Sequence, residues 1–86
     1  MDIGVEISLY PLMGQPIPCI HEFINGLRSH GRFRVESNSM STQVFGRYED
    51  VFGLLQQELQ AAFERLATQG HRAVFVMKVL GPLESV

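Results

Sequence analysis

The sequence predicts an α+β domain in which two helices pack on one face of a four-stranded antiparallel sheet. Two observations lead to this class. Apolar residues alternate with polar ones along some segments, and elsewhere they recur every three or four residues. The segments follow in the order strand, helix, strand, strand, helix, strand, which is the βαββαβ pattern of a ferredoxin-like sandwich. Residues 1–86 are few enough to form a single domain around one core.

The first element is a half-buried strand with two different faces. Its apolar residues are Ile3, Val5, Ile7 and Leu9, and they alternate with Gly4, Glu6, Ser8 and Tyr10. We expect this strand to end at Pro11. One face then points at the core, and the other carries the side chains of Glu6, Ser8 and Tyr10.

Two segments have helical spacing. The first has the apolar stripe Ile20, Phe23, Ile24 and Leu27, with Pro18 suited to the first turn and Gly31 to the carboxyl-terminal cap. The second is expected from about Glu49 to Gln69, with the stripe Val51, Leu55, Leu59, Ala62, Phe63 and Leu66. Glu49 and Asp50 at its start interact favourably with the positive end of the helix dipole. Gly70 can end this helix.

The remaining strands are expected at residues 33–38, 41–45 and 72–80, the first two joined around Ser39 and Met40. The last strand is apolar on both faces, with Val74 and Val76 on one and Phe75, Met77 and Val79 on the other. In this fold it lies beside the first strand. The sheet face without helices is therefore both apolar and polar, and it must meet solvent, a ligand or another subunit.

Composition excludes several classes of partner. The formal net charge is −2, so the chain has no basic field for nucleic acid or anionic lipid. The single cysteine cannot form a disulfide within the domain, and no apolar run reaches the roughly 18 residues of a membrane span. The chain begins directly with a strand pattern, so we expect it in the cytoplasm. Its small core favours self-association into a homo-oligomer.

The run from Ser37 to Gln43 is the most informative segment for function. Its residues are Ser37, Asn38, Ser39, Met40, Ser41, Thr42 and Gln43, of which all but one carry a hydrogen-bonding side chain and none is charged. Strand-forming residues bound the run on both sides, so we expect ordered strand and turn. Neutral donors and acceptors on a rigid backbone suit recognition of a small polar molecule better than proton transfer or covalent chemistry.

Residues that suggest catalysis or metal binding in isolation lack partners in the sequence. The candidates are His21, His30, His71, Cys19 and the serines at 37, 39 and 41. The histidine and cysteine spacings match no metal motif, and no nucleophile-elbow pattern surrounds the serines. We therefore expect solvated or locally bonded histidines, a partly buried thiol, and neither a catalytic nor a metal-ligating residue.

Glu6 has two interpretations of equal weight. A carboxylate in the middle of a central strand needs a cation or a ligand donor. Lys78, on the neighbouring last strand, is the structural candidate, and a ligand amine is the functional one. Tyr10 also has two interpretations. Its ring either packs against a neighbour at an interface, or it stacks on a ligand while its hydroxyl forms a hydrogen bond.

Two motifs resemble a known family. The segments Glu6-Ile7-Ser8-Leu9-Tyr10-Pro11-Leu12 and Ser37-Asn38-Ser39-Met40-Ser41-Thr42-Gln43-Val44-Phe45-Gly46 resemble the small thiamine-binding, YkoF-like family, and the likeness extends over nearly the whole chain. The resemblance implies a ferredoxin-like binding protein that holds thiamine or its hydroxymethylpyrimidine part. It also implies no catalysis, no other cofactor, and assembly as a homodimer or homotetramer. The ligand positions that it implies are Ser8, Tyr10, Asn38, Met40, Ser41 and Thr42.

The residue chemistry suits such a ligand. An aminopyrimidine needs hydroxyl and amide groups beside a flat or thioether wall, and the cationic thiazolium of thiamine would be favoured by Glu6 or Tyr10. Two alternatives stay open. One is an acylphosphatase-like enzyme, although residues 12–18 contain no arginine for a phosphate loop. The other, the stronger alternative, is an assembly module whose open sheet face only mediates oligomerisation. Ser85, near the carboxyl terminus, should be silent when substituted.

Overall fold

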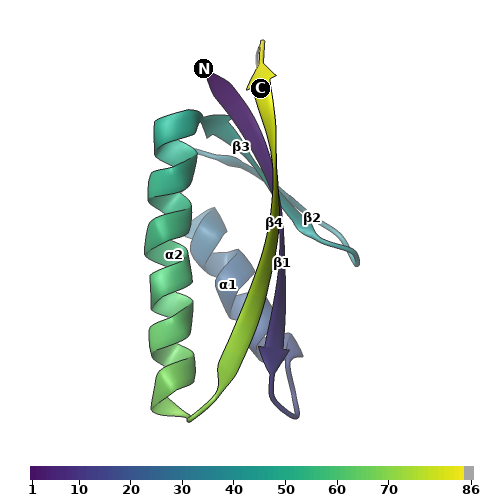
Figure 1. The fold of residues 1–86 in the computed structure, drawn as a ribbon, viewed down its shortest axis with the longest axis vertical. Helices are drawn as coiled ribbons and strands as arrows, with labels where there is room; N and C mark the ends of the chain where they lie inside the picture. Colours follow the sequence, from purple (N-terminus) through teal and green to yellow (C-terminus); the bar gives the residue numbers. More distant parts are fainter. Residues whose placement is uncertain (85–86) are drawn as a thin grey trace.

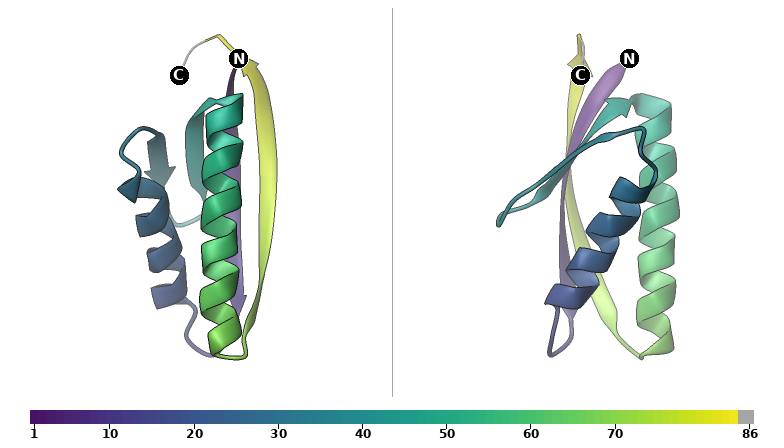
Figure 2. Two further views of the ribbon diagram at one scale, coloured as in Figure 1. Left: turned by 90° about the vertical axis from the view of Figure 1, so that its left-hand side faces the viewer. Right: turned by 180° about the vertical axis from the view of Figure 1, so that it is seen from behind.

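The computed structural model describes residues 1–84, and Ser85 lies outside them. Its elements, in chain order, are β1 (Asp2–Leu12), α1 (Ile17–Ser29), β2 (Arg34–Ser37), β3 (Thr42–Arg47), α2 (Tyr48–Thr68) and β4 (Arg72–Leu83). The strands form one antiparallel sheet in the order β2-β3-β1-β4, and both helices cover the same face (Figures 1 and 2). The predicted ferredoxin-like α+β architecture is confirmed. No helix among residues 1–84 is long and apolar enough to cross a membrane.

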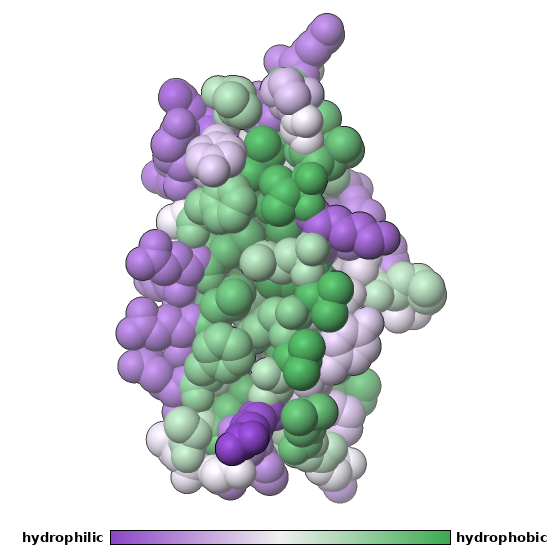
Figure 3. Space-filling model, viewed as in Figure 1, coloured by the Kyte–Doolittle hydropathy of each residue, from purple (hydrophilic) through white to green (hydrophobic). Residues whose placement is uncertain are grey.

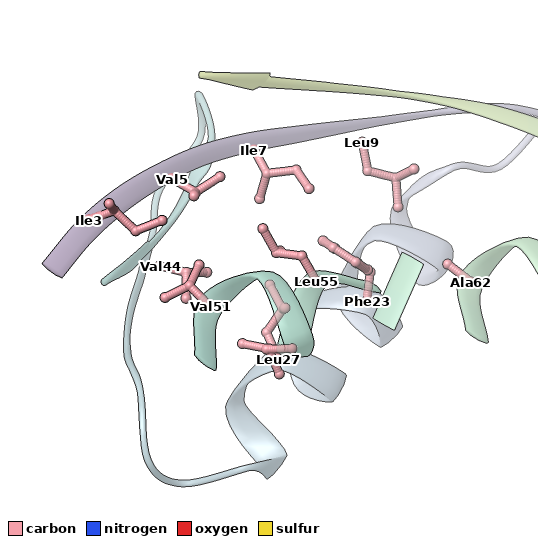
Figure 4. Close-up of a cluster of buried hydrophobic side chains, with 11 residues drawn as sticks. Ile3, Val5, Ile7, Leu9, Phe23, Leu27, Val44, Val51, Leu55 and Ala62 are labelled. Carbon is pink, nitrogen blue, oxygen red and sulfur yellow. The ribbon is translucent and has the colours of Figure 1, made fainter. Parts of the chain in front are cut away.

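The core lies between β1 and the two helices. Figure 4 shows the side chains of Ile3, Val5, Ile7 and Leu9 pointing from β1 toward side chains of α1 and α2. Leu27 of α1, Val44 of β3 and Val51 of α2 are completely buried against them. The burial of each such aliphatic side chain contributes about 1.5–3 kcal/mol relative to leaving it exposed. The alternation predicted for the first strand is therefore the alternation between core and open sheet face.

Both helices begin and end close to where the sequence places them. α1 carries Pro18 in its first turn, and α2 has Glu49 and Asp50 in its first turn. Gly31 and Gly70 follow the two helices with φ of 72° and 70°, a left-handed conformation that favours glycine. The proline position and both glycine stops are confirmed, and so are the helical stripes except at Phe63, which is exposed rather than in the core.

β1 is longer than predicted, because it continues through Pro11 to Leu12. It pairs with β3 only as far as Ile7 opposite Thr42, whereas it pairs with β4 as far as Leu12 opposite Arg72. Residues 8–12 of β1 therefore have a neighbouring strand on one side only. Proline is tolerated in such a strand because its missing N–H can face the unpaired side. The prediction that the strand ends at Pro11 is wrong for this reason.

The register of β4 against β1 shows which side chains of β4 lie on each face of the sheet. Val74 and Val76 lie opposite Tyr10 and Ser8, on the open face of the sheet. Phe75 points toward the helices, where its ring centroid is 4.9 Å from that of Phe23 and 5.4 Å from that of Phe63.

A carboxylate is buried where the two helices meet. Glu58 of α2 is 8% exposed, and its Oε2 lies 3.1 Å from Nε2 of His30. Gly26 of α1 leaves the space for it, since a Cβ there would overlap Glu58 Oε1. This buried pair is not predicted by the sequence pattern, which indicates only locally bonded histidines.

Candidate functional site

The candidate site is a cavity of about 240 Å³ where the β2–β3 hairpin diverges from β1. Figure 1 shows the hairpin turning away from β1 toward its tip, and Figure 2 shows α1 beside it on the helix face. We call this space the hairpin cavity. It is lined by Ile7, Ser8, Leu9, Tyr10, Ile20, Phe23, Ile24, Ser37, Asn38, Ser39, Met40, Ser41 and Thr42. It exists because β3 ends its pairing with β1 at Ile7, five residues before β1 itself ends.

The hairpin cavity receives side chains from both faces of the sheet. Ser8 and Tyr10 belong to the open face, whereas Thr42 lies opposite the buried Ile7 and belongs to the helix face. Alternate residues of a strand point to opposite faces, so the two sets meet only at a strand edge. The gap beside residues 8–12 of β1 is such an edge. Six of the seven predicted ligand residues line this one cavity, and Glu6 does not.

Asn38 holds the turn at the mouth of the cavity. Its Oδ1 accepts hydrogen bonds from the backbone N–H groups of Met40 (2.7 Å) and Ser41 (3.1 Å). The backbone N–H of Asn38 donates in turn to the carbonyl oxygen of Ser41 at 3.1 Å. This is the local turn bonding that asparagine supplies in place of backbone pairing. The side-chain oxygen of Asn38 is therefore used by the turn, and its Nδ2 is the group left to face a ligand.

The hydroxyl groups of the run form two further internal bonds. Ser37 Oγ and Thr42 Oγ1 are 3.0 Å apart, and Ser41 Oγ donates to Glu6 Oε2 at 3.0 Å. Thr42 is only 5% exposed, so its hydroxyl lies at the floor of the cavity. These bonds order the polar run before any ligand is present. Preorganised donors and acceptors lose less conformational entropy on binding.

Three hydroxyl groups at the cavity remain without an internal partner among residues 1–84. Ser8 Oγ is half-buried, Ser39 Oγ and the Tyr10 phenol are exposed, and none of the three makes a hydrogen bond within the described chain. Beside them, alternate backbone groups of residues 8–12 have no strand to pair with on the cavity side. The cavity thus combines free donors and acceptors with an apolar wall.

That apolar wall comes mainly from α1, and the sequence pattern did not predict it. Ile20, Phe23 and Ile24 line the hairpin cavity, although their spacing assigned all three to the core. Phe23 is buried, but Ile20 and Ile24 are only half-buried. They lie at the rim of the helical stripe, where a side chain can contact the core and a cavity at once. Met40, predicted as part of the wall, lines the cavity but is 83% exposed.

Glu6 lies in a second hollow on the open face of the sheet. This hollow, of about 260 Å³, is lined by Gly4, Val5, Glu6, Gln43, Phe45, Lys78 and Leu80. Lys78 Nζ is 3.9 Å from Glu6 Oε1, so the predicted structural partner is present. Because Lys78 is highly exposed, water screens this pair and its contribution to stability is small. Glu6 touches the hairpin cavity only through the hydroxyl of Ser41.

Of the other candidates, Ser37, Ser39 and Ser41 line the hairpin cavity, and His21 borders a neighbouring hollow that also includes Ser37 and Asn38. Cys19 borders a separate hollow beside the Arg65–Glu22 ion pair. Burial raises the pKa of the Cys19 thiol, Arg65 lowers this pKa and Glu22 raises it, so the thiol is not activated as a nucleophile. Within residues 1–84, no three side chains of His, Cys, Asp or Glu are grouped so as to hold a metal ion.

Comparison with solved structures supports the fold. The chain superimposes on a candidate thiamine biosynthesis or salvage protein from Thermotoga maritima with a TM-score of 0.74, 16% identity, and coverage of 100% of this chain and 89% of the other. A protein from Streptococcus pneumoniae gives 0.73, 14% identity, and 98% and 90% coverage. A domain of unknown function from Bacillus cereus gives 0.65, 12% identity, and 99% and 80% coverage. Identities this low show a shared fold alone.

No protein-family model matches the chain, and no curated protein is similar to it.

Proposed function

We propose that this chain is a binding protein for thiamine or for its hydroxymethylpyrimidine part, and that the hairpin cavity receives the pyrimidine ring. One observation carries the proposal. Residues 8–10 and 37–42, which are far apart in the sequence and hold the two family-like motifs, line a single cavity. A structural neighbour of the same fold, the Thermotoga maritima protein, is described as a candidate thiamine biosynthesis or salvage protein. This description supports the choice of ligand.

The chemistry of the cavity suits the polar edge of an aminopyrimidine. The ring offers acceptor nitrogens and an exocyclic amine, which need donors and acceptors placed together. Asn38 Nδ2 and the hydroxyl of Ser8 can donate, and the hydroxyl of Ser8 can also accept from the amine. Ile20, Ile24 and the ring of Tyr10 supply apolar contact for the flat faces.

The size of the cavity favours one ring over the whole vitamin. Its volume of about 240 Å³ is below the about 300–1,000 Å³ of most ligand sites. In this proposal the pyrimidine enters the cavity, and the cationic thiazolium of thiamine stays at the mouth. There the exposed phenol of Tyr10 and, beyond Ser41, the carboxylate of Glu6 attract a positive charge. Binding needs no catalysis and no other cofactor, and we place it in the cytoplasm.

Isothermal titration tests the proposal with hydroxymethylpyrimidine, thiamine and the isolated thiazole alcohol. We expect the first two to bind and the thiazole alcohol to bind much more weakly. Thr42→Val should weaken binding by about 1–3 kcal/mol, because it leaves Ser37 Oγ or a ligand group without its partner. Thr68→Val is the matched control, since this exposed hydroxyl caps the far end of α2. If millimolar ligand produces neither heat nor a thermal shift in the folded protein, the binding proposal fails and the assembly-module alternative takes its place.

A further inference from the structure

A second hollow adjoins the hairpin cavity where α1 faces the β2–β3 turn. It has a volume of about 380 Å³ and is lined by His21, Ile24, Asn25, Arg28, Ser37 and Asn38. Three of these residues, Ile24, Ser37 and Asn38, also line the hairpin cavity, so the two spaces share a border. We call the second space the α1 hollow. A ring bound in the hairpin cavity has the α1 hollow as its immediate neighbour.

The polarity of the α1 hollow follows from the residue spacing along α1. Its α1 residues recur at intervals of three, four and seven from the first, which places them on one side of the helix: His21, Ile24, Asn25 and Arg28. The neighbouring side carries Ile20 and Phe23 and lines the hairpin cavity. Helix α1 thus presents apolar side chains to the cavity and polar or basic ones to the hollow, with Ile24 between them.

Arg28 gives the α1 hollow a positive charge that no acidic residue neutralises. Five of the seven Lys and Arg residues form an ion pair with a carboxylate of the described chain, namely Arg32, Arg34, Arg47, Arg65 and Lys78. Arg28 pairs with none among residues 1–84, and the side chains of Arg28 and His21 make no hydrogen bond there. None of the six lining residues is acidic. The donors of this hollow are therefore available to an anion.

The face over α2 and β4 offers an anion much less. Figure 3 shows that this face is mostly apolar along its centre. Lys78 already contacts Glu6, and Arg72, the other unpaired arginine, lies at the start of β4 opposite Leu12. Among these positions, unpaired positive charge coincides with a polar hollow only at α1.

We propose that the α1 hollow binds the phosphate group of a phosphate monoester of hydroxymethylpyrimidine, so that the chain prefers this ester to the free alcohol. The inference rests on the proposed function, because the ring in the hairpin cavity sets the position of the phosphate. A phosphate monoester carries about −1.5 to −2 charges at pH 7 and three strong acceptor oxygens. The guanidinium of Arg28 donates charge-assisted hydrogen bonds to them. The ring N–H of His21 and the amides of Asn25 and Asn38 supply further donors.

The attachment point of the phosphate makes the α1 hollow a determinant of specificity. One CH2 group of the pyrimidine carries the thiazolium in thiamine and the phosphate in the ester. Glu6 lies on the open face of the sheet, beyond Ser41, whereas Arg28 belongs to α1 on the helix face. A cationic substituent is attracted toward Glu6 and an anionic one toward Arg28. Rotation about a single bond then directs each substituent to its own side of the turn at Asn38.

Isothermal titration with hydroxymethylpyrimidine and its phosphate monoester tests this preference. We expect the ester to bind about 10-fold more tightly, which is the lower end for a charge-assisted hydrogen bond because Arg28 is exposed. Arg28→Gln should remove most of this advantage and leave the affinity for the alcohol unchanged. Arg72→Gln is the matched control, because it removes an unpaired arginine at the opposite edge of the sheet. Equal affinities of the native protein for both compounds overturn the proposal, as does an advantage that survives Arg28→Gln.

Competition with inorganic phosphate gives a second readout on the native protein, without any substitution. Inorganic phosphate should weaken binding of the ester and not of the alcohol, because only the ester places charge in the α1 hollow. Sodium chloride at the same ionic strength is the control, since screening alone weakens any exposed charge pair. Equal weakening of ester binding by the two salts would contradict a phosphate site.

The ligand proposal and the phosphate proposal fail in different ways. Binding of the alcohol tests the hairpin cavity, and the ratio of the two affinities tests the α1 hollow. If only the ester binds and Arg28→Gln abolishes its binding, the α1 hollow holds a phosphate although the cavity proposal fails. If neither compound binds, both proposals are wrong.

Discussion

The two edge strands of this sheet differ in length, charge and surroundings. β2 has four residues, and two of them, Arg34 and Glu36, are exposed charges whose side chains lie 3.7 Å apart. Arg34 also covers the ring of Phe45, with its guanidinium 3.9 Å from the ring centroid. β4 has twelve residues and exposes apolar side chains on both faces. One edge is short and charged, and the other is long and uncovered.

The difference shows how one sheet can carry two kinds of surface. The short β2–β3 hairpin cannot follow β1 to its end, so it leaves the hairpin cavity and satisfies its own polar groups through Asn38, Ser37 and Thr42. β4 follows β1 to Leu12 and leaves no such gap on that side. The first edge suits a small polar ligand, and the second suits another strand.

The largest effect is expected where β4 contacts the helices. Phe75→Ala should lower the free energy of unfolding by about 2–3 kcal/mol, below the about 3–5 of a fully buried ring, because Phe75 is partly exposed. Val35→Ala, on the short edge strand, loses two methyl groups and should cost about 1 kcal/mol. Urea unfolding of both variants at one protein concentration measures the difference. Equal losses would show that the two edges are anchored to the core equally.

An intermediate effect is expected at the turn between β2, the shorter edge strand, and β3. Asn38→Ala removes the acceptor of two backbone N–H bonds and the Nδ2 donor, so it should weaken ligand binding by about 1–3 kcal/mol and lower stability by about 1 kcal/mol. Asn38→Asp keeps the acceptor and should restore the stability but not the affinity. Gln57→Ala, an exposed amide on α2, is the control. If Asn38→Asp restores both the stability and the ligand affinity, the side chain of Asn38 affects binding only by holding the turn.

The smallest effect is expected at Glu6, between the two regions. Glu6→Gln keeps an acceptor for the hydroxyl of Ser41 and loses only a screened ion pair, so stability should change by less than about 0.5 kcal/mol. The affinity for cationic thiamine should fall by less than about 1 kcal/mol, and that for neutral hydroxymethylpyrimidine should not change. Thermal melts and titrations with the two ligands measure this. An equal loss for both ligands would mean that Glu6 contacts the pyrimidine directly.

Much of the fold follows from local patterns in the sequence. The alternation from Ile3 to Leu9, the helical stripes apart from Phe63, Pro18 and the two helix-ending glycines depend on neighbours within one element, and all agree with the structure. The composition of residues 37–43 also identified an ordered polar turn correctly, because asparagine bonds its own backbone. These features are set by short-range physics, which a single sequence contains.

Only the tertiary structure decided the shape of the site and the use of each polar group. Pro11 stays in β1 because β3 has already diverged, and no pattern near Pro11 contains that information. The same divergence brings Ile20 and Ile24 to the cavity and leaves Glu6 outside its lining. The burial of Glu58 against His30 likewise depends on the space at Gly26, on another helix. Each of these outcomes depends on how far two strands or two helices remain side by side, which is a balance of long-range contacts rather than a local preference.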